Sequence, residues 1–210
     1  MIEFDSVVKE FSGKPVLRGM SLRIEKGETV SLVGTSGAGK TVTIKHMVRL
    51  LDPTSGRIVI DGEEIHDLPS KELGRMRMKF GFLFQGAALL QWMSVFDNVA
   101  LPLRENTRMP EEEVQEKVNA VLEKVGMTQA AEKLPADISG GMQKRAGLAR
   151  AVVTEPDILL YDEPTSGLDP VTSRTIDQLI HDLQQDLGVT SVVVTHDMIS
   201  ALIISDRIAM

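Results

Sequence analysis

The stretch "GTSGAGKT", residues 34–41, decides how the rest of this sequence is interpreted. It fits the spacing G-x-x-x-x-G-K-[ST] at every fixed position, between an apolar run and a segment of helical periodicity. Glycines let backbone N–H groups surround phosphate oxygens, and a helix N-terminus adds partial positive charge. We therefore predict a phosphate loop in which Lys40 contacts the outer phosphates and the Thr41 hydroxyl binds Mg²⁺. A glycine-rich turn beside an exposed lysine is the alternative. The other predicted phosphate ligands are Gly34, Thr35, Ser36, Gly37, Ala38 and Gly39.

Two acidic residues end a second apolar run, "ILLYDE", residues 158–163. Ligands of parallel sheets bind beyond the carboxyl ends of the strands, which is where these carboxylates are expected. Asp162 is predicted to bind Mg²⁺, and Glu163 to orient and deprotonate the attacking water. His196 follows the apolar run "SVVVT" and is placed to donate to a terminal phosphate. Taken alone, these residues also fit a solvated strand end and a structural histidine.

Apolar runs alternate with helical segments over much of the chain, which predicts an α/β protein with a mostly parallel sheet. Residues 22–33 predict a hairpin that leads into a buried strand. "GRIVIDG", residues 56–62, predicts a short strand closed by an Asp-Gly turn. From about residue 86 to residue 155 the pattern is helical, and we expect these residues to form an inserted helical lobe.

Composition excludes several classes of function. The net charge of −7 in 210 residues argues against a nucleic-acid surface as the main role of the chain. The sequence has no cysteine, so it forms no disulfide and no thiolate metal site. We see neither a secretory signal nor an apolar run near the roughly 18 residues that a membrane span needs. Any membrane role is therefore expected to come through a partner.

"DISGGMQKRAGLARA", residues 137–151, opens a helical pattern with two glycines, although glycine costs roughly 0.5–1 kcal/mol relative to alanine inside a helix. One interpretation is a Ser139 N-cap followed by a weakened first turn. The order of GTSGAGKT, Gln85, ISGGM, YDEP, SGLD and TH resembles the nucleotide-binding subunit of ABC transporters over nearly the whole chain. The resemblance implies that Ser139, Gly140 and Gly141 contact the γ-phosphate of an ATP molecule held by a second copy of the subunit.

The same resemblance assigns further site residues, with ATP and Mg²⁺ as the cofactors. Phe11 matches the aromatic residue that stacks on adenine, although a lone aromatic fits a core position equally well. Gln85 matches the residue that links Mg²⁺ and the attacking water to the helical lobe. Asp169 matches the loop that couples the two ATP sites across the dimer. Ile138 and Met142 depart from the Leu and Gln that the family usually has at these positions.

The resemblance implies a P-loop NTPase fold of ABC type, with a mostly parallel core sheet, an antiparallel β subdomain and an inserted α-helical lobe. Residues 1–85 and 156–210 are expected to form the core and the β subdomain. Residues 86–155 are expected to form the lobe, within a single ABC ATPase domain. The chain stops at Met210 inside an expected strand, where the family continues through a final strand and a helical tail, so we expect a truncated form.

The segment "FLFQGAALLQWMSVFDNVALPLREN", residues 82–106, is apolar enough to form the core of the lobe. In the family this region also borders the groove for a cytoplasmic helix of the permease. The sequence of this segment, together with SGGMQKRAGLARA and GLDPVTS, resembles the Mla-type phospholipid-trafficking ATPases, whose permeases work with lipid-binding MCE proteins. The implied partners are a second copy of the subunit, an integral membrane permease and an MCE-type protein. The implied location is the cytoplasmic face of the inner membrane.

Other functions fit the sequence less well. An ATPase of an amino-acid-type importer or of a lipoprotein-releasing system shares the motif set. A nucleotide-sensing module without hydrolysis is disfavoured because Gln85, Glu163 and His196 are all present. An ABC ATPase of DNA repair or translation needs a long coiled-coil insertion or tandem ATPase domains, and the sequence contains neither.

Overall fold

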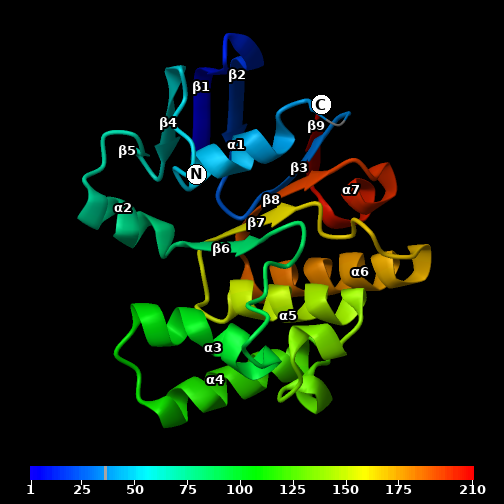
Figure 1. Ribbon diagram of the computed structural model, residues 1–210. Coiled ribbons are helices and arrows are strands. Elements are labelled where there is room, and N and C mark those ends of the chain that lie inside the picture. Colours follow the sequence, from blue (N-terminus) through cyan, green and yellow to red (C-terminus); the bar gives the residue numbers. More distant parts are fainter. Residues whose placement is uncertain (36) are drawn as a thin grey trace.

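The computed structural model describes residues 1–35 and 37–210, and it contains two β-sheets. Figure 1 shows the antiparallel sheet at one end of the molecule, the parallel sheet in the middle and a group of helices at the other end. The antiparallel sheet has the strand order β2-β1-β4-β5. Its strands are β1 (Ile2–Phe11), β2 (Lys14–Ile24), β4 (Ser55–Ile60) and β5 (Glu63–Glu64).

The parallel sheet has the strand order β6-β7-β8-β3-β9. Every residue of β7 and β8 is buried, because helices or strands cover both faces of the middle of this sheet. Because the strands run parallel, their carboxyl ends share one edge of the sheet, where the candidate site lies. The strands are β3 (Thr29–Val33), β6 (Phe80–Leu83), β7 (Ile158–Asp162), β8 (Thr190–Thr195) and β9 (Arg207–Ala209).

Seven α-helices connect the strands within the described residues. Three of them, α3 to α5, follow one another between β6 and β7 and lie at the end of the molecule opposite the antiparallel sheet (Figure 1). Asp169 caps the start of α6, and Gly188, at φ 61°, ends it. The helices are α1 (Lys40–Met47), α2 (Ser70–Arg77), α3 (Val95–Asn106), α4 (Glu111–Lys124), α5 (Gly140–Val152), α6 (Pro170–Leu187) and α7 (Met198–Ile204).

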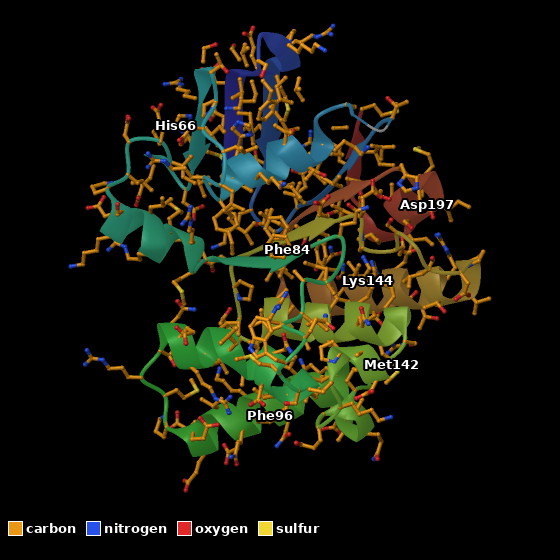
Figure 2. The ribbon with its side chains drawn as sticks, in the orientation of Figure 1. His66, Phe84, Phe96, Met142, Lys144 and Asp197 are labelled. Carbon is orange, nitrogen blue, oxygen red and sulfur yellow. The ribbon has the colours of Figure 1, made fainter. Side chains whose placement is uncertain are left out.

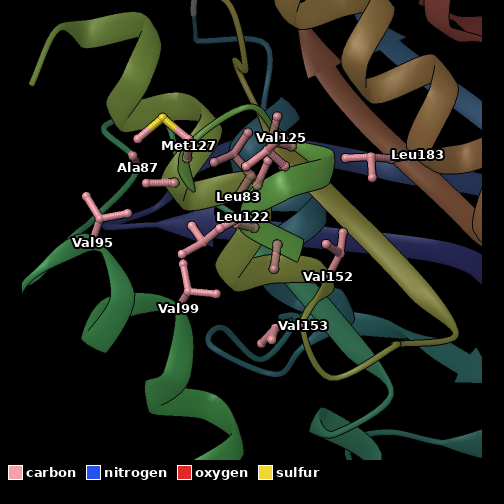
Figure 3. Close-up of a cluster of buried hydrophobic side chains, with 14 of the residues drawn as sticks. Leu83, Ala87, Val95, Val99, Leu122, Val125, Met127, Val152, Val153 and Leu183 are labelled. Atoms are coloured by element: carbon pink, nitrogen blue, oxygen red, sulfur yellow. The ribbon is translucent and has the colours of Figure 1, made fainter. Parts of the chain in front are cut away.

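Two apolar clusters hold the layers together, and β7 contributes to both. Leu159 and Tyr161 belong to the cluster that joins α3, α4 and α5 to α6 (Figure 3). Ile158 and Leu160 belong to the cluster that packs the antiparallel sheet and α1 against the parallel sheet. Successive residues of a strand point to opposite faces, so this one strand fixes the position of both clusters.

The predicted α/β class with a parallel sheet is confirmed, as are the buried strands β7 and β8. The strand β4 and its Asp-Gly turn are also confirmed, because Ile60 pairs with Glu63 across that turn. The hairpin predicted over residues 22–33 is wrong. β2 pairs with β1, whereas β3 pairs with β8 and β9 in the other sheet. The physical reason is that β3 is buried almost throughout and needs neighbours on both sides, while β2 is a largely exposed edge strand.

Candidate functional site

The phosphate loop follows β3 and leads directly into α1, which begins at Lys40. Gly39 has a φ of 89°, and a Cβ atom there would lie 2.8 Å from Leu17 Cδ2 and 3.1 Å from Val16 Cγ1. Both the left-handed backbone and the close approach of β2 require a glycine at this position. Ser36, one of the predicted phosphate ligands, lies outside the described residues.

The side chain of Lys40 folds back over the phosphate loop. Its Nζ donates to the carbonyl oxygens of Gly34 at 2.7 Å and Thr35 at 3.1 Å. These contacts keep a point charge beside the backbone that is predicted to surround the phosphates. The Lys40 ammonium group therefore bridges two backbone carbonyls of the phosphate loop.

Thr41 and Asp162 bring two oxygen ligands together from the start of α1 and the end of β7. The Thr41 hydroxyl donates to Asp162 Oδ1 at 2.8 Å. Asp162 is 5% exposed, and burial raises the pKa of its carboxyl group, although the hydrogen bond from Thr41 opposes that rise. A hydroxyl and a carboxylate are hard oxygen donors of the kind that Mg²⁺ prefers, usually with substrate phosphates completing its shell. The residues present therefore fit the predicted ion.

Glu163 and His196 form the pair at the ends of β7 and β8. His196 Nδ1 donates to Glu163 Oε2 at 2.7 Å, since an ionised carboxylate has only acceptors. The Glu163 side chain is 12% exposed, whereas that of His196 is 66% exposed. Glu163 also has a φ of 49°, in the left-handed region that non-glycine residues rarely adopt. A nearly buried carboxylate is thus oriented by an imidazole that reaches toward solvent.

Lys40, Thr41, Glu163 and His196 line one cleft of about 590 Å³, and Asp162 lies behind its Thr41 wall. Gln85 lines it from the segment after β6, and its Nε2 lies 3.5 Å from the Ser166 hydroxyl. Phe11, the predicted adenine contact, is 42% exposed at the end of β1 and is not among the lining residues, whereas Val16 is. The lining residues are Val16, Gly37, Gly39, Lys40, Thr41, Val42, Gln85, Glu163 and His196.

The turn over residues 139–141, here called the SGG turn, does not line this cleft. Ser139 is the N-cap of α5, and its side chain accepts a hydrogen bond from the Met142 N–H at 3.4 Å. Ser139 and Gly140 are exposed. A Cβ atom on Gly141 would lie 2.6 Å from Thr172 Cγ2, so α6 also approaches this turn closely. The SGG turn therefore has a capping and packing role inside the chain and still presents backbone outward.

Asp169 lies outside the cleft as well. Its Oδ1 accepts hydrogen bonds from the N–H groups of Val171 and Thr172 as the N-cap of α6. Hydrogen bonds from Thr172, side chain and backbone, lower the pKa of this carboxyl group. In one chain, then, the structure assigns Asp169 a capping role, and the predicted coupling between two ATP sites stays a prediction.

Sequence reasoning missed Lys144, which contacts the site from α5. The residue is 5% exposed, and its Nζ donates to the carbonyl oxygens of Gln85 and Glu163. Burial lowers the pKa of Lys144 to about 8, although the carboxylates of Asp162 and Glu163 oppose that shift. A signal was present in the sequence, since Lys144 shares a helix face with the buried Leu148.

The amino-acid sequence matches the ABC transporter family over residues 17–166. The probable ribonucleotide transport ATP-binding protein mkl of Mycobacterium tuberculosis is 43% identical, over 100% of this chain and 58% of that protein. The methionine import ATP-binding protein MetN 1 of Pseudomonas syringae is 41% identical, over 100% of this chain and 64% of that protein. The chain therefore spans less than two thirds of the length of these two relatives.

Two further comparisons concern a third relative and a solved structure. The intermembrane phospholipid transport system ATP-binding protein MlaF of Haemophilus influenzae is 39% identical, over 98% of this chain and 78% of that protein. A solved dimeric ATP-binding cassette in a post-hydrolysis state, bound to ADP and Pi, has a TM-score of 0.90 and 35% identity. That match covers 99% of this chain and 93% of the other, and it confirms the predicted ABC ATPase fold.

Proposed function

The chain belongs to the ABC transporter family, and we propose that it is the ATP-hydrolysing subunit of a transporter, dimerising on ATP and driving a separate membrane permease. One observation carries the hydrolytic part of this proposal. The pair formed by Glu163 and His196 lies on the same cleft as Lys40 and Thr41. A candidate base, its orienting imidazole and a phosphate-binding lysine therefore share one space of about 590 Å³.

Glu163 acts as the general base in this proposal. Its carboxylate takes a proton from the water that attacks the terminal phosphate, and Gln85, which lines the same cleft, positions that water. His196 Nδ1 holds the carboxylate at 2.7 Å, which leaves the exposed Nε2 edge of the ring for the terminal phosphate. Lys40 exchanges its loop carbonyls for phosphate oxygens as ATP enters.

Thr41 and Asp162 would hold Mg²⁺ in this site. When bound, the ion neutralises charge on the phosphates and orients them for in-line attack. The Thr41 hydroxyl already lies against Asp162 Oδ1, so the two oxygen ligands need little rearrangement to share an ion. Burial of Asp162 strengthens the attraction between its carboxylate and a cation.

The second copy of the chain completes the site in our proposal. The SGG turn does not line the cleft of its own chain, and an α-helix N-terminus with exposed glycine backbone suits a phosphate group. Two chains in head-to-tail arrangement would each offer this turn to the ATP held by the other. Asp169, close to that turn on the neighbouring α6, then lies at the junction between the two sites.

The permease is proposed to dock near Trp92, which is 75% exposed on the segment between β6 and α3. Asn98 is fully buried beneath this segment, and its side chain bonds to the backbone of Leu90, Met93 and Ser94. Trp92 is thus held outward on a rigid turn, as an anchor residue of an interface would be. Among the described residues, no helix combines the length and the apolar character that crossing a bilayer needs.

We propose phospholipid as the cargo and the cytoplasmic face of the inner membrane as the location, with an MCE-type protein as a further partner. This rests on the resemblance of residues 82–106 to Mla-type ATPases and on the similarity to the phospholipid transport protein MlaF. The second candidate, uptake of a small solute, is favoured by the similarity to the methionine import protein MetN 1.

Affinity purification of the tagged protein from detergent-solubilised membranes tests the cargo. Mass spectrometry should find an integral permease, an MCE-type protein and enriched phospholipid. A permease that co-purifies with a solute-binding protein and no enriched lipid would instead establish the small-solute alternative. Steady-state phosphate release by the same complex tests the ATPase itself, and a complex that binds ATP without releasing phosphate would overturn it.

A further inference from the structure

Lys144 is a buried lysine on α5 that binds two backbone carbonyls of the candidate site. Its Nζ donates to the carbonyl oxygen of Gln85 and, at 3.1 Å, to that of Glu163. Figure 2 shows Lys144 on the side of α5 nearer the parallel sheet. One side chain therefore joins the segments that follow β6 and β7, which carry the proposed water-positioning residue and the proposed base.

The segment after Gln85 is seated on α5 by further contacts. Arg150 donates to the carbonyl oxygens of Ala87 at 2.6 Å and Ala88 at 2.7 Å, and both alanines have positive φ. A Cβ atom on Gly147 would lie 2.7 Å from Leu83 Cδ1 and 3.1 Å from Ala87 Cβ, so the helix is in close contact with the end of β6 and with this segment. The position of Gln85 consequently follows the position of α5.

The backbone of Glu163 depends on contacts of the same kind. Its N–H donates to the carbonyl of Val194 at 2.8 Å, and its carbonyl accepts from the Ser166 N–H at 3.2 Å and from Lys144. These bonds fix a left-handed backbone conformation that a glutamate rarely adopts. Of these donors to the Glu163 carbonyl, Lys144 is the one that comes from α5, and the SGG turn lies at the start of that helix.

We propose that Lys144 is a positioning residue that fixes Gln85 and Glu163 relative to each other and transmits displacement of the SGG turn to both. It does not touch substrate. Engagement of the turn by the partner's ATP would thereby align the base and the water-positioning residue in the same movement. This inference rests on the proposed ATPase function, because it assigns Lys144 a part in the timing of that reaction.

The test compares Lys144→Met with Lys144→Gln in the full-length protein with its permease. Methionine keeps the volume of the lysine stem and removes its donors, whereas glutamine retains an NH₂ group with two donors. Lys124→Met is the control. Lys124 is half exposed on α4, and its contact with the exposed Asp186 is long, at 3.7 Å between Nζ and Oδ2. Steady-state phosphate release gives kcat and KM, and binding of a fluorescent ATP analogue without Mg²⁺ gives the Kd.

We expect Lys144→Met to lower kcat about tenfold or more, because small misplacements of reacting groups cost that much. The Kd of the ATP analogue should stay within about twofold, since Lys144 does not line the cleft. Lys144→Gln should recover most of the turnover, and Lys124→Met should match the wild type. A lysine that only supports packing would instead change stability and leave kcat unaltered.

An unchanged kcat in Lys144→Met, or an equal loss in the methionine and glutamine variants, would overturn the inference. If the methionine variant does not fold, the glutamine variant decides. A kcat of Lys144→Gln below a tenth of the wild-type value would then contradict the positioning role of Lys144. Wild-type protein that releases no phosphate would refute the ATPase function itself. Active wild type with an unaffected Lys144→Met refutes only the positioning role.

Discussion

The cleft and the SGG turn differ in how far each is completed by its own chain. In the cleft, Lys40, Thr41, Glu163 and His196 are each bound to another group of the same site. At the SGG turn, the Ser139 side chain caps α5 and Gly140 presents exposed backbone. The cleft is preorganised within one chain. The turn makes capping and packing contacts within its chain and, in our proposal, binds the ATP held by a second copy.

Substitutions in the two regions should therefore change different properties of the protein. A change in the cleft removes a group whose neighbours are already in place, so its effect should fall on the chemical step. A change in the SGG turn should act on stability through packing with α6, on hydrolysis through the partner, or on both. The predictions below separate these effects, starting with the largest.

Glu163→Gln should reduce kcat for ATP hydrolysis by about 10²–10⁴, the usual contribution of a general base. Glutamine keeps an oxygen that can accept from His196 Nδ1, so ATP binding should persist. Phosphate release and nucleotide binding measure the two effects separately. Glu155→Gln is the control, since Glu155 is exposed and forms a surface ion pair with Lys117. Undiminished turnover in Glu163→Gln would show that the preorganised carboxylate of the cleft is not the base.

Gly140→Ala should lower turnover about tenfold or more, because the added methyl group would keep the partner's phosphate away from the exposed backbone N–H groups. The protein should be at least as stable, since alanine favours a helix more than glycine does. A Cβ atom at this position meets only Leu168 Cδ2 at 3.5 Å, an ordinary contact inside the chain. Any loss of activity must then arise outside it. Thermal unfolding and phosphate release on the same sample check the prediction. Full activity in this variant would mean that the SGG turn serves its own chain alone.

Gly141→Ala should destabilise the protein by about 1–3 kcal/mol, the usual cost of overpacking. The added Cβ would lie 2.6 Å from Thr172 Cγ2, and one of the two groups must move. Thr172→Ser removes that methyl and keeps the hydroxyl, so the double variant should recover most of the loss in urea unfolding. Additive effects of the two substitutions would argue against this contact as the cause.

The smallest expected effect is a dependence of the protein's stability on pH, caused by His46 in α1, the helix that follows the phosphate loop. His46 is 1% exposed at the end of α1, and burial lowers the pKa of its imidazole, with Lys9 adding to that shift. The unfolded chain then binds a proton at higher pH than the folded one, so this contribution to stability is complete above about pH 6.5 and is lost as pH falls toward the lower folded value. Urea midpoints from pH 7.5 to 5 should fall less steeply in His46→Leu. Identical slopes would exclude His46 as the source.

Local patterns in the sequence pointed to residues that lie together in the candidate cleft, but they did not predict all of the strands around it. GTSGAGKT and ILLYDE are local patterns, and the structure brings Thr41, at the start of α1, together with Asp162, at the end of β7. β1 was not predicted because its alternation breaks at Ser6, which has a φ of 52° beside a shift in strand register. β6 is four residues long and contains Gly81, too short for a clear period.

Contacts made across the chain lie beyond local patterns. Lys144 is 59 residues from Gln85 in sequence, and the hydrogen bond between them depends on how α5 packs on β6. The close approach of Thr172 to Gly141 depends likewise on how α6 packs. The two glycines of the SGG turn predict that another group approaches their backbone closely. The resemblance implies that this group is a phosphate of the partner's ATP, and the structure shows a second one, Thr172 of the same chain.

Trp92 gives the protein a built-in optical reporter. It is the single tryptophan of the sequence, so all indole fluorescence comes from one exposed ring on the turn held by Asn98. An indole in water emits at longer wavelength than one covered by apolar groups. A shift of the emission maximum on adding a tryptophan-free peptide of the permease would therefore follow docking at this surface in real time, without any attached dye.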